Sequence, residues 1–100
     1  MGYYFIVDTY IGEERNQYDT YIAEVRPIVE RYGGKYLVRT EEVQSLSENR
    51  TPQRSIVIRF PTKEALLHCF ESEEYQAIAG KRIANVDARA IIVPGMEEKL

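Results

Sequence analysis

Tyrosine and arginine are the residues of this chain whose types and positions could recognise a small molecule. The sequence holds eight tyrosines in 100 residues, and each tyrosine hydroxyl that is buried in a core needs a hydrogen-bonding partner. Guanidinium groups can supply that partner, and they also hold carboxylates. An apolar pocket with tyrosine hydroxyls and a guanidinium would suit a small carboxylate or phenolic ligand. The candidate ligand-binding residues are Tyr21, Arg39, Arg59, Tyr75 and Arg82.

The same side chains also have a purely structural interpretation. The hydroxyls and guanidinium groups could satisfy one another at the rim of the core or at a dimer seam. Two hypotheses for function therefore stay open. In the first, the protein is a small-molecule binding protein or a cofactor-independent enzyme, with a sheet–helix pocket lined by Tyr21, Tyr75 and Arg82. In the second, it is a non-enzymatic dimeric module in which the tyrosines serve packing.

The other side chains with reactive potential point to no further chemistry. His68 is the sole histidine, so any imidazole mechanism would need it, but it falls off the apolar face of its helix and is interpreted as a surface residue. Cys69 is the sole cysteine, so the chain cannot form an internal disulfide. We interpret Cys69 as a small apolar residue of a helix and not as a reactive thiol. Because no histidine and cysteine lie at ligand spacing, we expect no metal site and no cofactor.

Composition excludes several classes of partner. A net charge of −3 and a pI near 5.2 give no positive field for a phosphate backbone, so nucleic acid is not expected. No apolar run approaches the roughly 20 residues that span a bilayer, so no membrane is expected and a cytoplasmic location fits. The length and the 44% hydrophobic content indicate one domain over residues 1–95. Residues 96–100 form a short charged tail.

The hydrophobic pattern predicts the elements that must position these residues. Period-two alternation predicts strands. These are Tyr3–Tyr10, Lys35–Thr40 continuing over Val43–Leu46 past a bend or bulge at Glu41–Glu42, Arg54–Phe60 and Val86–Val93. Helical spacing predicts one helix from residue 14 or 16 to Tyr32, and a second that starts after Thr62 and restarts at Ser72. The order is β-α-β-β-α-β, a ferredoxin-like α+β fold with a four-stranded antiparallel sheet and two helices on one face.

The strands are apolar on both sides, which predicts a second copy of the chain. In the first strand, Phe5 and Val7 lie on one face while Tyr4 and Ile6 lie on the other. Helices can cover only one face, and a monomer would leave the other exposed. We therefore expect a homodimer that packs sheet on sheet with two-fold symmetry.

Several short stretches together resemble a known family. They are Tyr32 to Tyr36 (YGGKY), Arg54 to Pro61, Ser72 to Gln76 followed by Arg82, and the closing Pro94-Gly95. The chain resembles the bacterial family called domain of unknown function thirteen-thirty, in the dimeric α+β barrel superfamily. It departs from that family at Arg39-Thr40-Glu41, where Arg-Gly-Gly is common, and at Cys69-Phe70, where Trp-Tyr is frequent. The resemblance implies a dimer with back-to-back sheets and a small pocket between sheet and helices, and it implies no assigned reaction.

Overall fold

One antiparallel sheet carries the architecture of the described chain. The computed structural model describes residues 2–11, 16–83 and 86–96, with the side chains of residues 16–18 and 82–83 outside the description. Within these residues four strands lie in the order β2-β3-β1-β4. Their bounds are β1 (Tyr3–Ile11), β2 (Lys35–Thr40), β3 (Arg54–Phe60) and β4 (Val86–Pro94).

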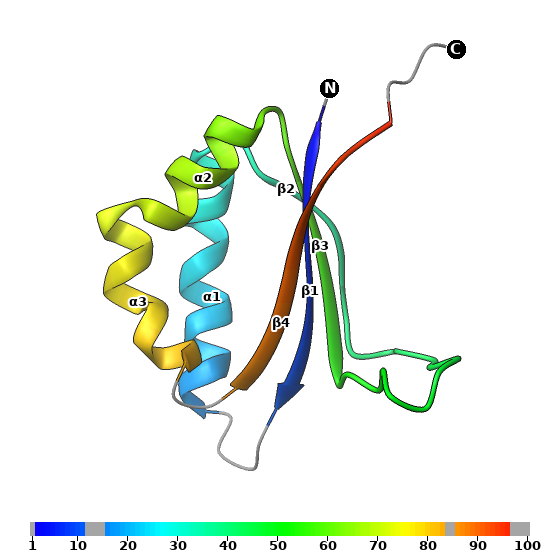
Figure 1. Cartoon of the computed structure of the whole chain (residues 1–100). Helices are drawn as coiled ribbons and strands as arrows, with labels where there is room; N and C mark the ends of the chain where they lie inside the picture. The colour runs from blue at the N-terminus through cyan, green and yellow to red at the C-terminus, as the bar shows by residue number, and fades with distance from the viewer. Residues whose placement is uncertain (1, 12–15, 84–85, 97–100) are drawn as a thin grey trace.

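All the helices of the described residues lie on one face of this sheet (Figure 1). They are α1 (Asn16–Arg31), α2 (Lys63–Glu71) and α3 (Glu73–Ile83). The ferredoxin-like α+β fold predicted from the sequence is confirmed, with the second helical region divided into α2 and α3. No helix of the described residues is long and apolar enough to cross a bilayer.

Ser72 divides the second helical region, as its position in the sequence predicted. The Thr62 hydroxyl begins α2 by accepting from the backbone N–H of Ala65 at 3.0 Å. At the other end, the Ser72 hydroxyl donates to the carbonyl of Cys69 at 2.7 Å and accepts from the N–H of Tyr75 at 3.2 Å. One side chain therefore satisfies the last turn of α2 and the first turn of α3.

The end of α1 is fixed by two glycines. Gly33 has φ +89, a conformation that favours glycine, and it ends the helix as predicted. The N–H of Gly34 then donates to the carbonyl of Val29 at 2.9 Å. A Cβ on Gly34 would lie 2.4 Å from Val29 Cγ1 and 2.9 Å from the Phe60 ring, so the chain turns here in direct contact with the core.

The alternation of β1 separates the two faces of the sheet. Val7 pairs with Ile56 of β3 and Ala90 of β4, and these three share the face beneath the helices. Ile6 pairs with Val57 and Ile91 on the other side. We call this second side the open face, because no helix of the described residues covers it; its residues include Tyr4, Ile6, Val38, Val57, Arg59 and Ile91.

The prediction of a strand over residues 43–46 is wrong. β2 ends at Thr40, whose hydroxyl accepts from the N–H of Glu42 at 2.9 Å and so turns the chain. Leu46, in the loop of residues 41–53 between β2 and β3, is 96% exposed. Figure 1 shows this loop on the side of the sheet away from the helices. Of the bend or bulge predicted at residues 41–42, the chain bends at Glu41, while the register of β2 shifts earlier, between Tyr36 and Val38.

An ion pair connects the second half of this loop to β1. Arg50 donates to both carboxylate oxygens of Asp8, at 2.6 and 3.3 Å. Asp8 is buried while Arg50 is exposed, so the guanidinium supplies the charged partner that the buried carboxylate requires.

Candidate functional site

A cavity of about 440 Å³ lies between the helices and the sheet. This volume falls within the usual range for small-molecule pockets. The wall is mostly aliphatic and aromatic, with contributions from α1, all four strands and the junction of α2 with α3. Its residues are Phe5, Val7, Thr9, Tyr21, Ile22, Val25, Val29, Tyr36, Ile56, Ile58, Phe70, Tyr75, Ala88 and Ala90.

Two tyrosine hydroxyls meet in this wall. The oxygens of Tyr21, on α1, and Tyr75, on α3, lie 3.0 Å apart, and either can be the donor. Both side chains are buried, and their rings meet edge to face at 6.2 Å. Tyr21 is set by the apolar stripe of α1 that continues through Val25, and Tyr75 by the N–H that it donates to Ser72. The pair places neutral hydrogen-bonding groups beside an apolar space.

A third tyrosine, Tyr36 of β2, also lines the cavity. Burial raises the pKa of its hydroxyl from 10.0 to about 12, although Arg39 and Arg26 act in the opposite direction. Their guanidinium carbons lie 5.9 and 5.6 Å from the centre of its ring. Tyr36 is therefore a neutral hydroxyl at physiological pH, held by cation–π contacts. The sequence-based site did not include it.

An aromatic cluster forms another part of the wall. Phe70 stacks on Phe5 with ring centres 4.6 Å apart and an interplanar angle of 27°. Tyr75 meets Phe70 edge to face at 4.9 Å. Such surfaces favour a flat ring over an extended aliphatic chain.

The predicted arginines do not join the two tyrosines in the described structure. Arg39 is exposed and contacts the ring of Tyr36 without lining the cavity. Arg59 lies on the open face, paired with Tyr4 and beside Gly2, so the sheet separates it from the cavity. The side chain of Arg82 lies outside the described residues. Among the four candidates whose side chains are described, Tyr21 and Tyr75 are the two that come together.

The remaining reactive side chains lie away from the cavity wall. His68 is exposed and Cys69 is fully buried. Burial, reinforced by the negative charge of Glu74, raises the pKa of the Cys69 thiol from 9.0 to about 11. The thiol is thus protonated at neutral pH and is a poor nucleophile.

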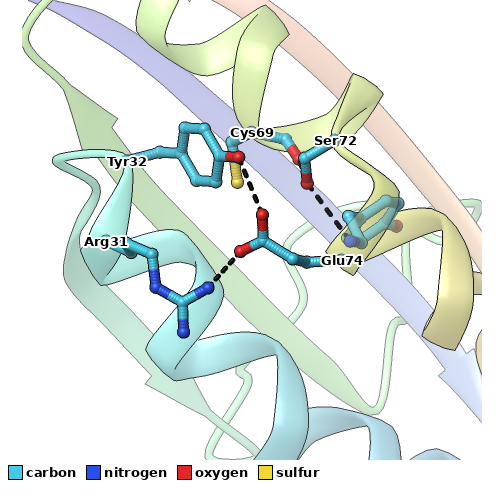
Figure 2. Close-up of polar contacts among 6 residues, drawn as sticks. Arg31, Tyr32, Cys69, Ser72 and Glu74 are labelled. Atoms are coloured by element: carbon cyan, nitrogen blue, oxygen red, sulfur yellow. Dashed lines mark hydrogen bonds and ion pairs between the residues drawn. The ribbon is translucent and has the colours of Figure 1, made fainter.

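Glu74 connects the end of α1 with the start of α3. Its carboxylate accepts from the Tyr32 hydroxyl at 3.1 Å and from the guanidinium of Arg31 (Figure 2). Both Arg31 and Glu74 are exposed, so the pair contributes little to stability by itself. This polar contact links the end of α1 to the start of α3 outside the described wall of the cavity, and it brings no charge into that wall.

Family and structural comparisons support the fold. A family model with the description Domain of unknown function (DUF1330) matches residues 2–96. A protein of unknown function from Rhodopseudomonas palustris is similar over 97% of this chain and 84% of its own, with a TM-score of 0.80 and 16% identity. No curated protein matches the sequence.

Two further solved structures share the fold at lower scores. SnoaB, a cofactor-independent oxygenase from Streptomyces nogalater, covers 97% of this chain and 95% of its own, with a TM-score of 0.68 and 11% identity. A dimeric ferredoxin-like protein of unknown function from Thermobifida fusca covers 93% and 90%, with a TM-score of 0.68 and 12% identity. At such identities the likeness establishes a common fold and no common activity.

Proposed function

The chain belongs to the DUF1330 family, and we propose that it binds a small ring-bearing molecule in the cavity between sheet and helices, where a reaction that needs no cofactor could follow. The observation that carries the proposal is a 440 Å³ apolar cavity with a buried pair of tyrosine hydroxyls in its wall. Apolar walls give affinity, and a few fixed polar groups orient the ligand.

The enzymatic part of the proposal is supported by likeness of fold alone. SnoaB is a cofactor-independent oxygenase of similar architecture, so this architecture is compatible with such chemistry. In the described part of the present cavity, the groups that can transfer a proton are the hydroxyls of tyrosine and Thr9. A reaction here would depend mainly on the reactivity of the ligand itself, once the cavity orients it.

Binding can be tested with a variant that fills the cavity. Ala90 lines the cavity from the edge strand β4 and is exposed, so phenylalanine at this position should occupy part of the space. A panel of small phenols should raise the melting temperature of the wild type and have no effect on Ala90→Phe. Ala23→Phe, at an exposed position of α1, makes the same chemical change away from the cavity and should keep the response. An equal response in Ala90→Phe would count against the cavity as the binding site.

We also propose that the protein is a homodimer in which the two copies pack against each other through their open faces. The row formed by Val57, Ile6 and Ile91 crosses three strands of that face, and Ile91 is 58% exposed. An apolar row of this kind is characteristic of a protein interface. The ferredoxin-like protein from Thermobifida fusca is described as dimeric, which agrees with this arrangement.

A second function is favoured by the tyrosine pair itself. Because the hydroxyls of Tyr21 and Tyr75 hydrogen-bond to each other, they can serve packing without a ligand. The protein would then be a non-enzymatic dimeric module. A wild type that responds to no small phenol or acid, and whose crystal structure has a filled interior, would favour this alternative.

A further inference from the structure

We propose that the cavity selects the uncharged form of its ligand, a neutral ring with a hydroxyl or carbonyl oxygen, and rejects carboxylates and phenolates. This inference rests on the proposed binding function and narrows the earlier expectation of an acidic or phenolic ligand to one charge state. It follows from which groups line the cavity and which groups stay outside it.

The described wall of the cavity contains no formal charge. Its residues are aliphatic, aromatic or hydroxyl-bearing, and no aspartate, glutamate, lysine, arginine or histidine is among them. An anion in contact with the described wall loses hydration on that side and gains no opposite charge from the wall. The neutral form of the same molecule avoids this cost.

The two arginines near Tyr36 do not remove that cost. Arg26 and Arg39 contact the Tyr36 ring, and Arg26 also pairs with Glu30 at 3.4 Å. The pKa of the Tyr36 hydroxyl shows which effect is larger. Burial raises this pKa to about 12 although the positive charges of both arginines lower it. A phenol bound against the same wall is also desolvated, and this desolvation likewise favours its protonated form.

Hydrogen bonding in the cavity suits a neutral oxygen. Each tyrosine hydroxyl can donate one hydrogen bond and accept others. When Tyr21 donates to Tyr75, the hydroxyl hydrogen of Tyr75 can be given to a ligand oxygen at the same wall. A ring seated on Phe70 would also be close to the ring that carries this hydroxyl, since the Phe70 and Tyr75 rings lie 4.9 Å apart. A carbonyl or hydroxyl oxygen is a sufficient acceptor, and no charge is needed.

Three probes of similar shape separate the charge states. Para-nitrobenzyl alcohol is neutral, para-nitrobenzoate is an anion, and para-nitrophenol changes between the two forms near neutral pH. Equilibrium dialysis should show saturable binding of the alcohol with the same Kd at each pH, and no saturable binding of the benzoate. The Kd of para-nitrophenol should rise about tenfold for each pH unit above its own pKa, because only the protonated form binds. The absorption band of the phenolate should be absent from the bound probe.

Variants identify which arginine matters if an anion does bind. Arg39→Gln should leave the binding of all three probes within about twofold of wild type, because Arg39 contributes no surface to the cavity. Arg82, whose side chain lies outside the described residues, is tested in the same way with Arg82→Gln. Benzoate binding as tight as that of the alcohol would overturn the inference, and its loss in Arg82→Gln would identify Arg82 as an anion-holding group. Binding of no probe at any pH would overturn the proposed function as well.

Discussion

The hydroxyl oxygens of Tyr21 and Tyr75 lie 3.0 Å apart although 54 positions separate the two residues in the chain. The hydrogen bond joins α1 to α3 at the wall of the cavity, and the sheet forms another part of that wall. The same contact thus fixes the spacing of the helices and supplies the polar group of the candidate site.

Tyr75→Phe should lower the free energy of unfolding by about 1–2 kcal/mol, because it removes a buried hydrogen bond and takes a partner from Tyr21. Denaturant unfolding measures the change. Tyr32→Phe removes a hydroxyl that bonds to the exposed carboxylate of Glu74, and should cost less than about 0.5 kcal/mol. Equal losses in the two variants would mean that the buried pair has no special contribution.

Ile91→Lys should convert the protein to a monomer. The substitution places a charge in the apolar row of the open face, where a partner would have to bury it. Light scattering at micromolar concentration should give about twice the chain mass of 11.6 kDa for the wild type and the single-chain mass for the variant. Ala77→Lys, at an exposed position of α3, should remain a dimer. A monomeric wild type would refute the dimer proposal directly.

Two glycine substitutions should change stability in opposite directions. At Gly34 a Cβ would meet Val29 at 2.4 Å and Phe60 at 2.9 Å, so Gly34→Ala should destabilise the protein by about 1–3 kcal/mol. At Gly80, inside α3, a Cβ would meet nothing within 4 Å, so Gly80→Ala should stabilise it by about 0.5–1 kcal/mol. Thermal unfolding distinguishes the two, and a stabilising Gly34→Ala would show that the backbone there can move aside.

Stability should fall as pH rises above 9. Burial raises the pKa of Cys69 from 9.0 to about 11 and that of Tyr36 from 10.0 to about 12. Both groups are neutral when protonated, so the folded state keeps its protons to higher pH than the unfolded chain does, and each group's stabilisation is lost between its two pKa values. Between pH 9 and 11 Cys69 should contribute a decrease that approaches roughly 1 kcal/mol per pH unit in the middle of this range.

The variant Cys69→Ala isolates this contribution. It leaves Tyr36 as the titrating group and should delay the onset of the decrease by about one pH unit. Urea unfolding at a series of pH values measures both curves. If the variant and the wild type lose stability in parallel from pH 9, another group is responsible.

The fold could be predicted because its signals are local. Ile56, Ile58 and Phe60 alternate with polar or smaller residues, and β3 has the predicted bounds. Ser72 was recognised as a helix restart because the preference for a hydroxyl at a helix N-terminus depends on a few neighbouring residues. The strand predicted over residues 43–46 failed because alternation shows that a segment can be a strand and does not supply a partner strand for it.

The site was predictable only in part, for a related reason. The alternation that buries Ile58 and Phe60 requires Arg59 between them to face the other way, and this signal was present in the sequence. Tyr36 was missed because a register shift between Tyr36 and Val38 interrupts the alternation of β2. The meeting of Tyr21 with Tyr75 depends on how two helices dock, which no local pattern determines.

The two alanines of β4 give the cavity an adjustable size. Ala88 and Ala90 are its smallest lining residues, and they stand on the outermost strand of the sheet. A larger side chain at either alanine would reduce the volume of the cavity. A larger side chain at Val7 or Ile58 would instead clash with its neighbours in the core. The volume of the cavity can therefore be changed at this edge while the central strands and the tyrosine pair stay as they are.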